Sequence, residues 1–292
     1  MNRTPAIEIR GLTKRFGDRT VLHRLDLDVD HGIVALLGRN GAGKTTLINV
    51  LSTLLRPDDG VVRVFGHDVV DEGAAVRRSI GVTGQFTAID EQLTGRENLV
   101  MMGRLFGLAR SAAQRRADEL LDRFDLAAHA TERAGRYSGG MRRRLDLAVS
   151  LLGTPRLIVL DEPTTGLDAI SRAALWDEVR EVARRGVAVL LTTQYLEEAD
   201  ALADRVVVLD AGRIVADGSP DELRSRVGSD VVDVLDPIGR IRCSLPTDGT
   251  AADSARVLAT LAPSARVLIR RPTMDEVFVQ LTSARQIEEI AS

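Results

Sequence analysis

The stretch from Gly38 to Thr46, which reads GRNGAGKTT, has the residue types and the spacing of a phosphate-binding loop. Its glycines let backbone N–H groups wrap around phosphate oxygens, and a helix that starts there adds a favourable dipole. Lys44 would reach the β- and γ-phosphates of a nucleotide, and Thr45 would bind Mg²⁺. A glycine turn that only caps a helix is the alternative. We expect contacts to the nucleotide phosphates from Gly38, Arg39, Asn40, Gly41, Ala42, Gly43, Lys44, Thr45 and Thr46.

Asp161 and Glu162 are the second group suited to this chemistry. They follow the apolar run LIVL and precede Pro163, which prevents regular strand pairing from continuing. Asp161 is suited to hold Mg²⁺ through water, and Glu162 to accept a hydrogen bond from the water that attacks a γ-phosphate. An acidic surface pair before a proline is the alternative. With the phosphate-binding loop present, we predict Lys44 and Glu162 to be catalytic, and Thr45 and Asp161 to be metal ligands.

Two further polar features need an explanation. Ser138, Gly139 and Gly140 stand directly before an apolar helical stretch, which makes a second helix N-terminus suited to an anion. One phosphate-binding loop holds one nucleotide, so spacing alone assigns no ligand to this second site. Gln194 ends the run VLLTTQ, at the carboxyl end of a predicted strand, where open α/β sheets present their chemistry. Taken alone, Gln194 is equally well a polar strand end.

A mainly parallel sheet covered by helices must position these residues. Alternating residues on either side of the turn FGD predict an antiparallel pair at the front of the chain. Buried strands and helices then alternate, and a hairpin is expected around Ala211 and Gly212. This order predicts an α/β fold. Strands are expected at 33–37, at LIVL and at VAVLL, and helices at 44–55, from 94, and at 111–124, 170–185 and 196–203.

The chain divides into two predicted domains. Residues 1–225 form the nucleotide-binding domain, with a helical subdomain at about 86–155 that opens at the capping-box pair Thr94 and Glu97. Residues 226–292 change to short strands and helices and are expected to form a small α+β appendage. Its last helix begins at Thr273 and is expected to reach about Leu281. No chemistry is indicated for the appendage, and packing is one interpretation of it beside regulation, dimer strengthening and contact with a partner.

Composition excludes several classes. The chain has 292 residues, 44% of them apolar, which is typical of a globular protein with a full core. No apolar run approaches the roughly 18 residues of a membrane helix, and the N-terminus does not resemble a signal peptide. One cysteine gives no disulfide framework, so we expect a cytoplasmic protein. The net charge of −3 and the absence of a long basic run argue against nucleic-acid binding.

Together these motifs resemble the ATP-binding-cassette ATPases, the nucleotide-binding subunits of ABC transporters, over about residues 7–218. The resemblance implies a P-loop NTPase cassette with an antiparallel N-terminal β subdomain and a helical signature subdomain. It also implies a head-to-tail homodimer, in which the signature of one cassette closes over ATP held by the other. On this basis Gln85 resembles the Q-loop glutamine, a metal and water contact, and Phe16 resembles the aromatic that stacks on adenine. The remaining matches are the D-loop residue Asp168 and the signature residues Tyr137, Ser138, Gly139, Gly140 and Met141.

Five positions depart from the common pattern of that family. Tyr137 replaces leucine, Met141 replaces glutamine, and Arg39 and Ala169 replace frequent prolines; none of these removes a phosphate contact. The fifth, Gln194, stands where the family has its switch histidine. Its amide can donate to a phosphate oxygen and accept from water, as glutamine does in small GTPases, so we predict a catalytic role for Gln194.

The variant signature, Gln194 and the tail RPTMDEVFVQLTS resemble daunorubicin- and doxorubicin-resistance-type exporter ATPases. That resemblance implies ATP-driven efflux of a hydrophobic drug or lipid-like molecule, with a separate membrane permease as partner and a place on the cytoplasmic face of the cell membrane. A glycolipid exporter fits nearly as well. A non-transport cassette of the translation or DNA-repair type is the alternative from another class. A P-loop kinase or GTPase would explain Lys44 and Asp161 but would leave the signature without a role.

Overall fold

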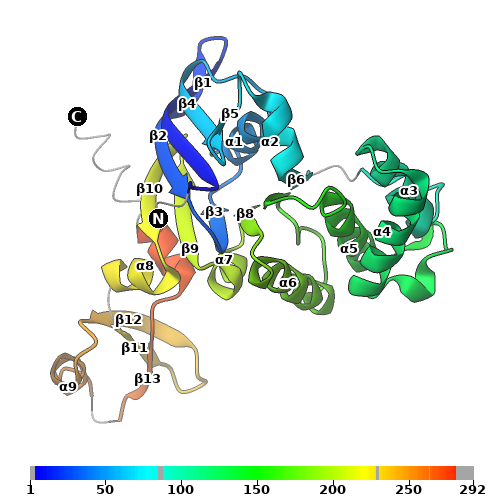
Figure 1. Cartoon of the computed structure of the whole chain (residues 1–292). Coiled ribbons are helices and arrows are strands. Elements are labelled where there is room, and N and C mark those ends of the chain that lie inside the picture. Colours follow the sequence, from blue (N-terminus) through cyan, green and yellow to red (C-terminus); the bar gives the residue numbers. More distant parts are fainter. Residues whose placement is uncertain (1–3, 85–87, 228–229, 263, 281–292) are drawn as a thin grey trace.

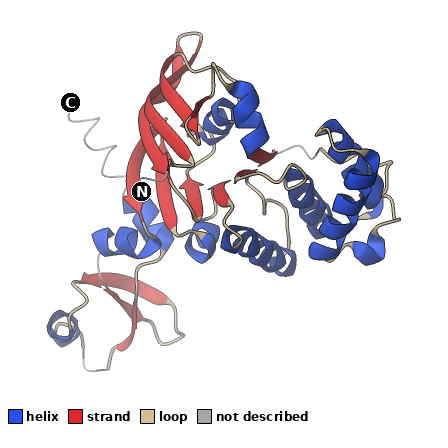
Figure 2. Cartoon of the chain, in the orientation of Figure 1, coloured by secondary structure: helices blue, strands red, loops and turns tan. Residues whose placement is uncertain are grey.

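The computed structural model describes residues 4–84, 88–227, 230–262 and 264–280. Strands gather on one side of the molecule, and a separate group of helices stands on the other (Figure 2). The predicted class, α/β with a mainly parallel central sheet, is confirmed. Within the described residues no helix is long and apolar enough to cross a membrane.

The central sheet has the strand order β10-β9-β3-β8-β7-β6 (Figure 1). All neighbours pair in parallel except β10, which pairs antiparallel with β9. Their connection is the predicted hairpin, and its residues Ala211 and Gly212 both have positive φ. The strands are β3 (Ile33–Leu37), β6 (Ile80–Thr83), β7 (Leu157–Asp161), β8 (Ala188–Thr193), β9 (Arg205–Asp210) and β10 (Arg213–Gly218).

Both faces of this sheet are buried, because successive residues of a strand point to opposite faces. In β3, Ile33, Ala35 and Leu37 join a core with the helices, whereas Val34 and Leu36 join the core beneath a second, antiparallel sheet. That sheet has the order β2-β1-β4-β5 and contains the predicted N-terminal pair. Its strands are β1 (Ile7–Phe16), β2 (Arg19–Val29), β4 (Asp59–Val64) and β5 (His67–Asp68).

The helical group contains α3, α4 and α5 (Figure 1). Its first helix begins with the predicted capping box of Thr94 and Glu97. One predicted boundary is wrong: α1 ends at Leu51 and does not reach residue 55, since the Ser52 hydroxyl bonds the Ile48 carbonyl and Thr53 has a φ of 64°. The helices are α1 (Lys44–Leu51), α2 (Gly73–Ser79), α3 (Gly95–Leu105), α4 (Arg110–Arg123), α5 (Gly139–Ser150), α6 (Ala169–Arg184), α7 (Leu196–Leu202) and α8 (Pro220–Val227), with 3₁₀ turns η1 (Ala127–His129) and η2 (Ala134–Arg136).

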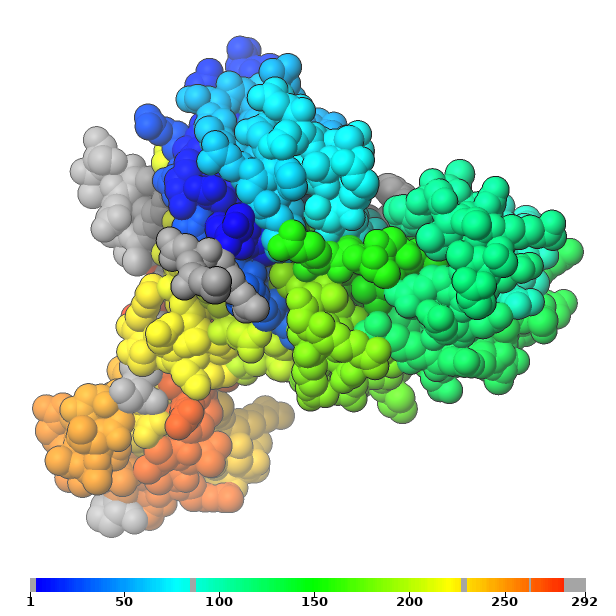
Figure 3. Space-filling view, in the orientation of Figure 1, coloured from blue at the N-terminus to red at the C-terminus, as the bar shows by residue number. Residues whose placement is uncertain are grey.

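The C-terminal residues form a lobe beside the main body (Figure 3). It consists of a three-stranded sheet, in the order β12-β11-β13, and one helix. After β13 the chain returns to the main body, where Met274 and Val277 are buried in the same core as β8 and β9. Residues 274–280 are helical. The lobe elements are β11 (Asp230–Leu235), β12 (Ile241–Thr247), α9 (Ala251–Ala259) and β13 (Arg266–Arg270).

Candidate nucleotide site

The glycine-rich loop connects β3 to α1, as predicted. Gly38 N donates to the carbonyl of Thr193 on β8 (3.2 Å), which fixes the start of the loop. A Cβ on Gly38 would lie 2.5 Å from the carbonyl oxygen of Leu209, and one on Gly43 would lie 2.7 Å from Leu22. Gly43 also has a φ of 109°, where a side chain would be strained. The close packing of the loop against β9 and β2 therefore depends on these glycines.

Lys44 is buried at the first turn of α1, with only 5% of its side chain exposed. Its ammonium donates to the carbonyl of Gly38 (2.7 Å) and lies 3.3 Å from Glu162 Oε1. Thr45, the next residue, donates from its hydroxyl to Asp161 Oδ2 (3.2 Å). The structure thus brings together four predicted site residues from α1 and from the end of β7.

Thr192 on β8 holds both acidic residues in place, and sequence reasoning assigned it no role. Its hydroxyl donates to Asp161 Oδ1 (2.5 Å) and accepts from the backbone N–H of Glu162 (3.1 Å). Glu162 has a φ of 49°, an unfavourable conformation for a residue with a side chain. The sequence does contain a signal for this support: Thr192 and Thr193 are two hydroxyl residues at the end of an otherwise apolar strand.

Two cavities adjoin the loop. The larger, about 460 Å³, is lined by Arg19, Val21, Asn40, Gly41, Gly43, Lys44, Thr45, Thr46 and Glu162. The second, about 390 Å³, is lined by Leu37, Gly38, Arg39, Asn40, Gln194, Leu196 and Phe278. Arg19 and Val21 come from β2 and Phe278 from the C-terminal helix, and sequence reasoning named none of the three. Gln194 follows directly after β8 and lies beside the loop.

The predicted adenine contact, Phe16, lies away from the larger cavity. Phe16 ends β1, is 49% exposed and has the Lys14 ammonium 5.5 Å from its ring centre. Phe16 does not line the larger cavity, to which the neighbouring strand contributes Arg19 and Val21 instead. Gln85 lies outside the described residues.

The signature residues form the start of α5. Ser138 is its N-cap and accepts from the backbone N–H of Met141 (3.2 Å). A Cβ on Gly140 would lie 2.7 Å from the Ser171 hydroxyl of α6, so the loop packs closely against that helix. Asp168 caps α6 and accepts from the backbone N–H of Ser171 (2.8 Å). None of residues 137–141 lines either of the two cavities beside the phosphate-binding loop.

Tyr137 has a structural reason to replace leucine. It is 3% exposed, and its hydroxyl donates to the carbonyl of His129 (2.8 Å), which satisfies the one polar atom of the side chain. Gly95 leaves room for it, since a Cβ there would lie 2.1 Å from the tyrosine oxygen. This departure therefore concerns packing within the helical group.

Asp146 on α5 provides a pH test of stability. It is 4% exposed, and burial raises its pKa to about 6, although Arg143 lies 3.7 Å away. The folded chain therefore binds more protons than the unfolded chain between the ordinary value of 3.8 and about 6, so stability falls as pH rises through that window. Asp146→Asn, which stays neutral, should raise the free energy of unfolding at pH 8 by roughly 1 kcal/mol more than at pH 5. Urea unfolding would measure this.

Asp177→Asn is the matched control, because this carboxylate is 77% exposed. Its effect should be small and equal at both pH values. An Asp146→Asn gain that is the same at pH 5 and pH 8 would contradict the assigned pKa.

The fold and this loop define the chain as a P-loop NTPase. Residues 22–165 match the ABC transporter family. The chain is also 50% identical to the daunorubicin resistance ATP-binding protein DrrA3 of Streptomyces coeruleorubidus, over 98% of this chain and 99% of the relative. The chain belongs to the ATP-binding subunits of ABC transporters, and it is an ATPase.

Two further similarities agree with this. The Nod factor export ATP-binding protein I of Rhizobium sp. (strain N33) is 38% identical over 97% of this chain and 99% of the relative. A solved structure described as the ATP-binding subunit of an ABC transporter has a TM-score of 0.71 and 27% identity, and it covers 95% of this chain and 99% of its own. The predicted family and the predicted ATPase activity are thereby confirmed.

Proposed function

We propose that this chain drives the export of a hydrophobic small molecule through a separate membrane permease. Two copies bind Mg-ATP head to tail, and the dimer sits on the cytoplasmic face of the membrane. The observation that supports the proposed dimer is the position of the serine-glycine loop at the start of α5, which lines neither of the two cavities beside the phosphate-binding loop of its own chain. Closing over the cavity of a second copy would give this helix N-terminus an anion to bind.

The residues at the loop fit ATP and Mg²⁺. The Thr45 hydroxyl and the Asp161 carboxylate are hard oxygen donors, which Mg²⁺ prefers. Lys44 already points along the loop, and phosphate oxygens would replace the Gly38 carbonyl as its acceptor. Bound Mg²⁺ would neutralise charge that develops on the γ-phosphate. By their resemblance to the family motifs, Phe16 would stack on adenine, Gln85 would contact the metal, and Asp168 would reach the partner copy.

Glu162 and Gln194 act on the attacking water. Glu162 accepts a hydrogen bond from it; the backbone N–H of Glu162 is held by Thr192, and its carboxylate lies beside the Lys44 ammonium. Gln194 donates from its amide to the γ-phosphate and accepts from the same water. Because glutamine cannot become cationic, Glu162 is the main group that activates the water.

Gln194→Ala tests the proposed role of the glutamine. The variant loses a hydrogen bond to a charged group, roughly 1.5 to 3 kcal/mol, so kcat for ATP should fall on the order of tenfold to a hundredfold. Gln194→His is the matched variant, which should stay active and gain a pH dependence between about pH 5 and 8. Wild-type turnover by the alanine variant would show that Gln194 has no role in hydrolysis and only ends the strand.

The substrate class rests on the names of the relatives. One is a daunorubicin resistance protein and another a Nod factor export protein, so the related exporters act on different molecules. The proposal is tested by purifying the tagged chain from its native membranes and by measuring ATP-driven daunorubicin accumulation in inverted vesicles. Co-purification with an integral membrane protein and transport that requires ATP are expected. Co-purification with ribosomes or DNA, without a membrane protein, would refute export.

A further inference from the structure

The chain of the C-terminal lobe returns to the catalytic region. After β13, helical residues 274–280 place Met274 and Val277 in the core shared with β8, β9 and α7, where they are 3% and 0% exposed. The next residue, Phe278, packs against that core and lines the 390 Å³ cavity together with Gln194 and the loop residues Gly38, Arg39 and Asn40. An aromatic ring from the lobe thus borders the same space as Gln194.

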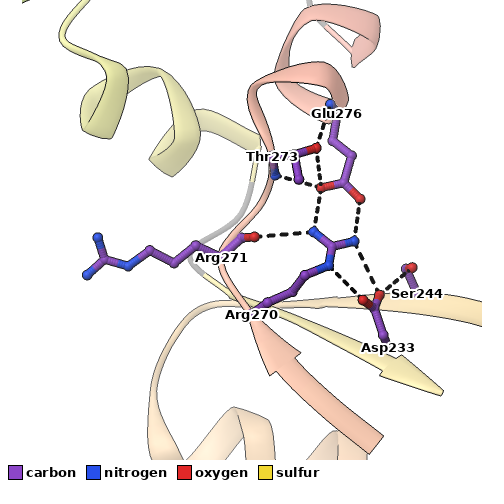
Figure 4. Close-up of polar contacts among 6 residues, drawn as sticks. All are labelled: Asp233, Ser244, Arg270, Arg271, Thr273 and Glu276. Atoms are coloured by element: carbon purple, nitrogen blue, oxygen red, sulfur yellow. Dashed lines mark hydrogen bonds and ion pairs between the residues drawn. The ribbon is translucent and has the colours of Figure 1, made fainter. Parts of the chain in front are cut away.

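An arginine joins this helix to the lobe (Figure 4). Arg270 Nε donates to Asp233 Oδ2 on β11 (2.6 Å), and its two terminal nitrogens donate to the carboxylate oxygens of Glu276 (2.8 and 2.9 Å). Asp233 is fully buried and also accepts from the hydroxyl of Ser244 (2.6 Å). Glu276 further accepts from the backbone N–H of Thr273 at the start of the helix (2.8 Å). Planar, two-pronged pairs of this kind fix orientation as well as distance.

We propose that Phe278 is a positioning residue for Gln194. We also propose that the bonds of Arg270 to Asp233 and Glu276, here called the Arg270 clamp, make the C-terminal lobe part of the ATPase mechanism. This inference rests on the proposed role of Gln194. The ring limits the space open to the glutamine amide at the edge of the cavity, and Met274 and Val277 hold the ring in place. A rotation of the lobe is carried through Arg270 and Glu276 to Phe278. Contact between the lobe and the permease would therefore alter the rate of hydrolysis.

The test compares kcat and KM for ATP in the full-length chain. Phe278→Ala should lower kcat roughly fivefold or more, since small displacements of a catalytic group are costly, with KM within about twofold. Val279→Ala, an adjacent and 61% exposed control, should leave both unchanged. In a Gln194→Ala background, Phe278→Ala should have no further effect on kcat, because the two residues act as a unit. If Phe278→Ala does not fold, Phe278→Leu, which keeps an apolar side chain, replaces it in the same measurement.

The outcomes separate this inference from the proposed function. Normal kcat in the Phe278 variants, with a reduced kcat in Gln194→Ala, overturns only the inference. Effects that multiply in the double variant also overturn it, because they would show that Phe278 acts by general packing. Wild-type turnover by Gln194→Ala would instead remove the role of the glutamine itself. Glu276→Gln weakens the ion pair with Arg270 but keeps an acceptor for the backbone N–H of Thr273. This substitution should lower kcat when Gln194 is present and should have no effect on kcat in the Gln194→Ala variant.

Discussion

Replacing Lys44 with alanine is expected to abolish ATP hydrolysis, with kcat reduced at least about a hundredfold. The reason is the loss of a buried cation at the position where negative charge develops on the transferring phosphate. Lys44 lies 3.3 Å from Glu162 and is 5% exposed, so alanine would remove the buried cation at this position. A steady-state phosphate-release assay on the purified chain would measure the loss.

Lys14→Ala is the natural control, because Lys14 and Lys44 are the two lysines of the chain. Lys14 pairs with Asp58 in a salt bridge whose acidic partner is 41% exposed, so its loss should change stability little. Its kcat should stay within about threefold of wild type. Thermal melting of both variants would exclude unfolding as the cause, and substantial turnover by Lys44→Ala would refute the assigned site.

The phosphate-binding loop could be predicted from sequence because its determinants are local. A fully buried strand, glycines at fixed spacing and a following lysine specify strand, turn and helix within about fourteen residues. The hairpin at Ala211 and Gly212 and the capping box at Thr94 are local in the same way. At these three places neighbouring residues determine the backbone, and sequence and structure agree.

Contacts between distant residues could not be predicted in this way. The hydroxyl of Thr192 supports Asp161 and Glu162 only because β7 and β8 pair in a particular register. Arg270 meets Asp233 through strand pairing inside the lobe. Phe278 reaches the cavity beside Gln194 because the chain returns to the main body after β13, and no sequence periodicity encodes that return. The supporting residues of the site were therefore missed, whereas its central residues were predicted.

Replacing Glu162 with glutamine is also expected to have a large effect on ATP hydrolysis. Glutamine keeps the size of the side chain and leaves the backbone bonds to Thr192 intact, so the positive φ at this position should persist. It cannot accept a proton from water as a carboxylate does, and general-base catalysis contributes roughly 10² to 10⁴ in rate. Hydrolysis should therefore almost stop while ATP binding is retained. ATP bound without turnover should hold two cassettes together.

The measurement is the oligomeric state of Glu162→Gln by size-exclusion chromatography with light scattering, in Mg-ATP and in Mg-ADP. A dimer with ATP and a monomer with ADP are expected. Glu197→Gln is the control for a change from carboxylate to amide, because Glu197 lies on α7 with its side chain 74% exposed and pairs with Arg172; it should hydrolyse ATP normally. Ser138→Arg, added to Glu162→Gln, should prevent the ATP-dependent dimer, because a bulky cation would replace the small cap of α5, which the proposed dimer places against the partner nucleotide. A Glu162→Gln chain that stays monomeric with ATP would refute the head-to-tail site, whereas a dimer that forms equally well with Ser138→Arg would place the interface elsewhere.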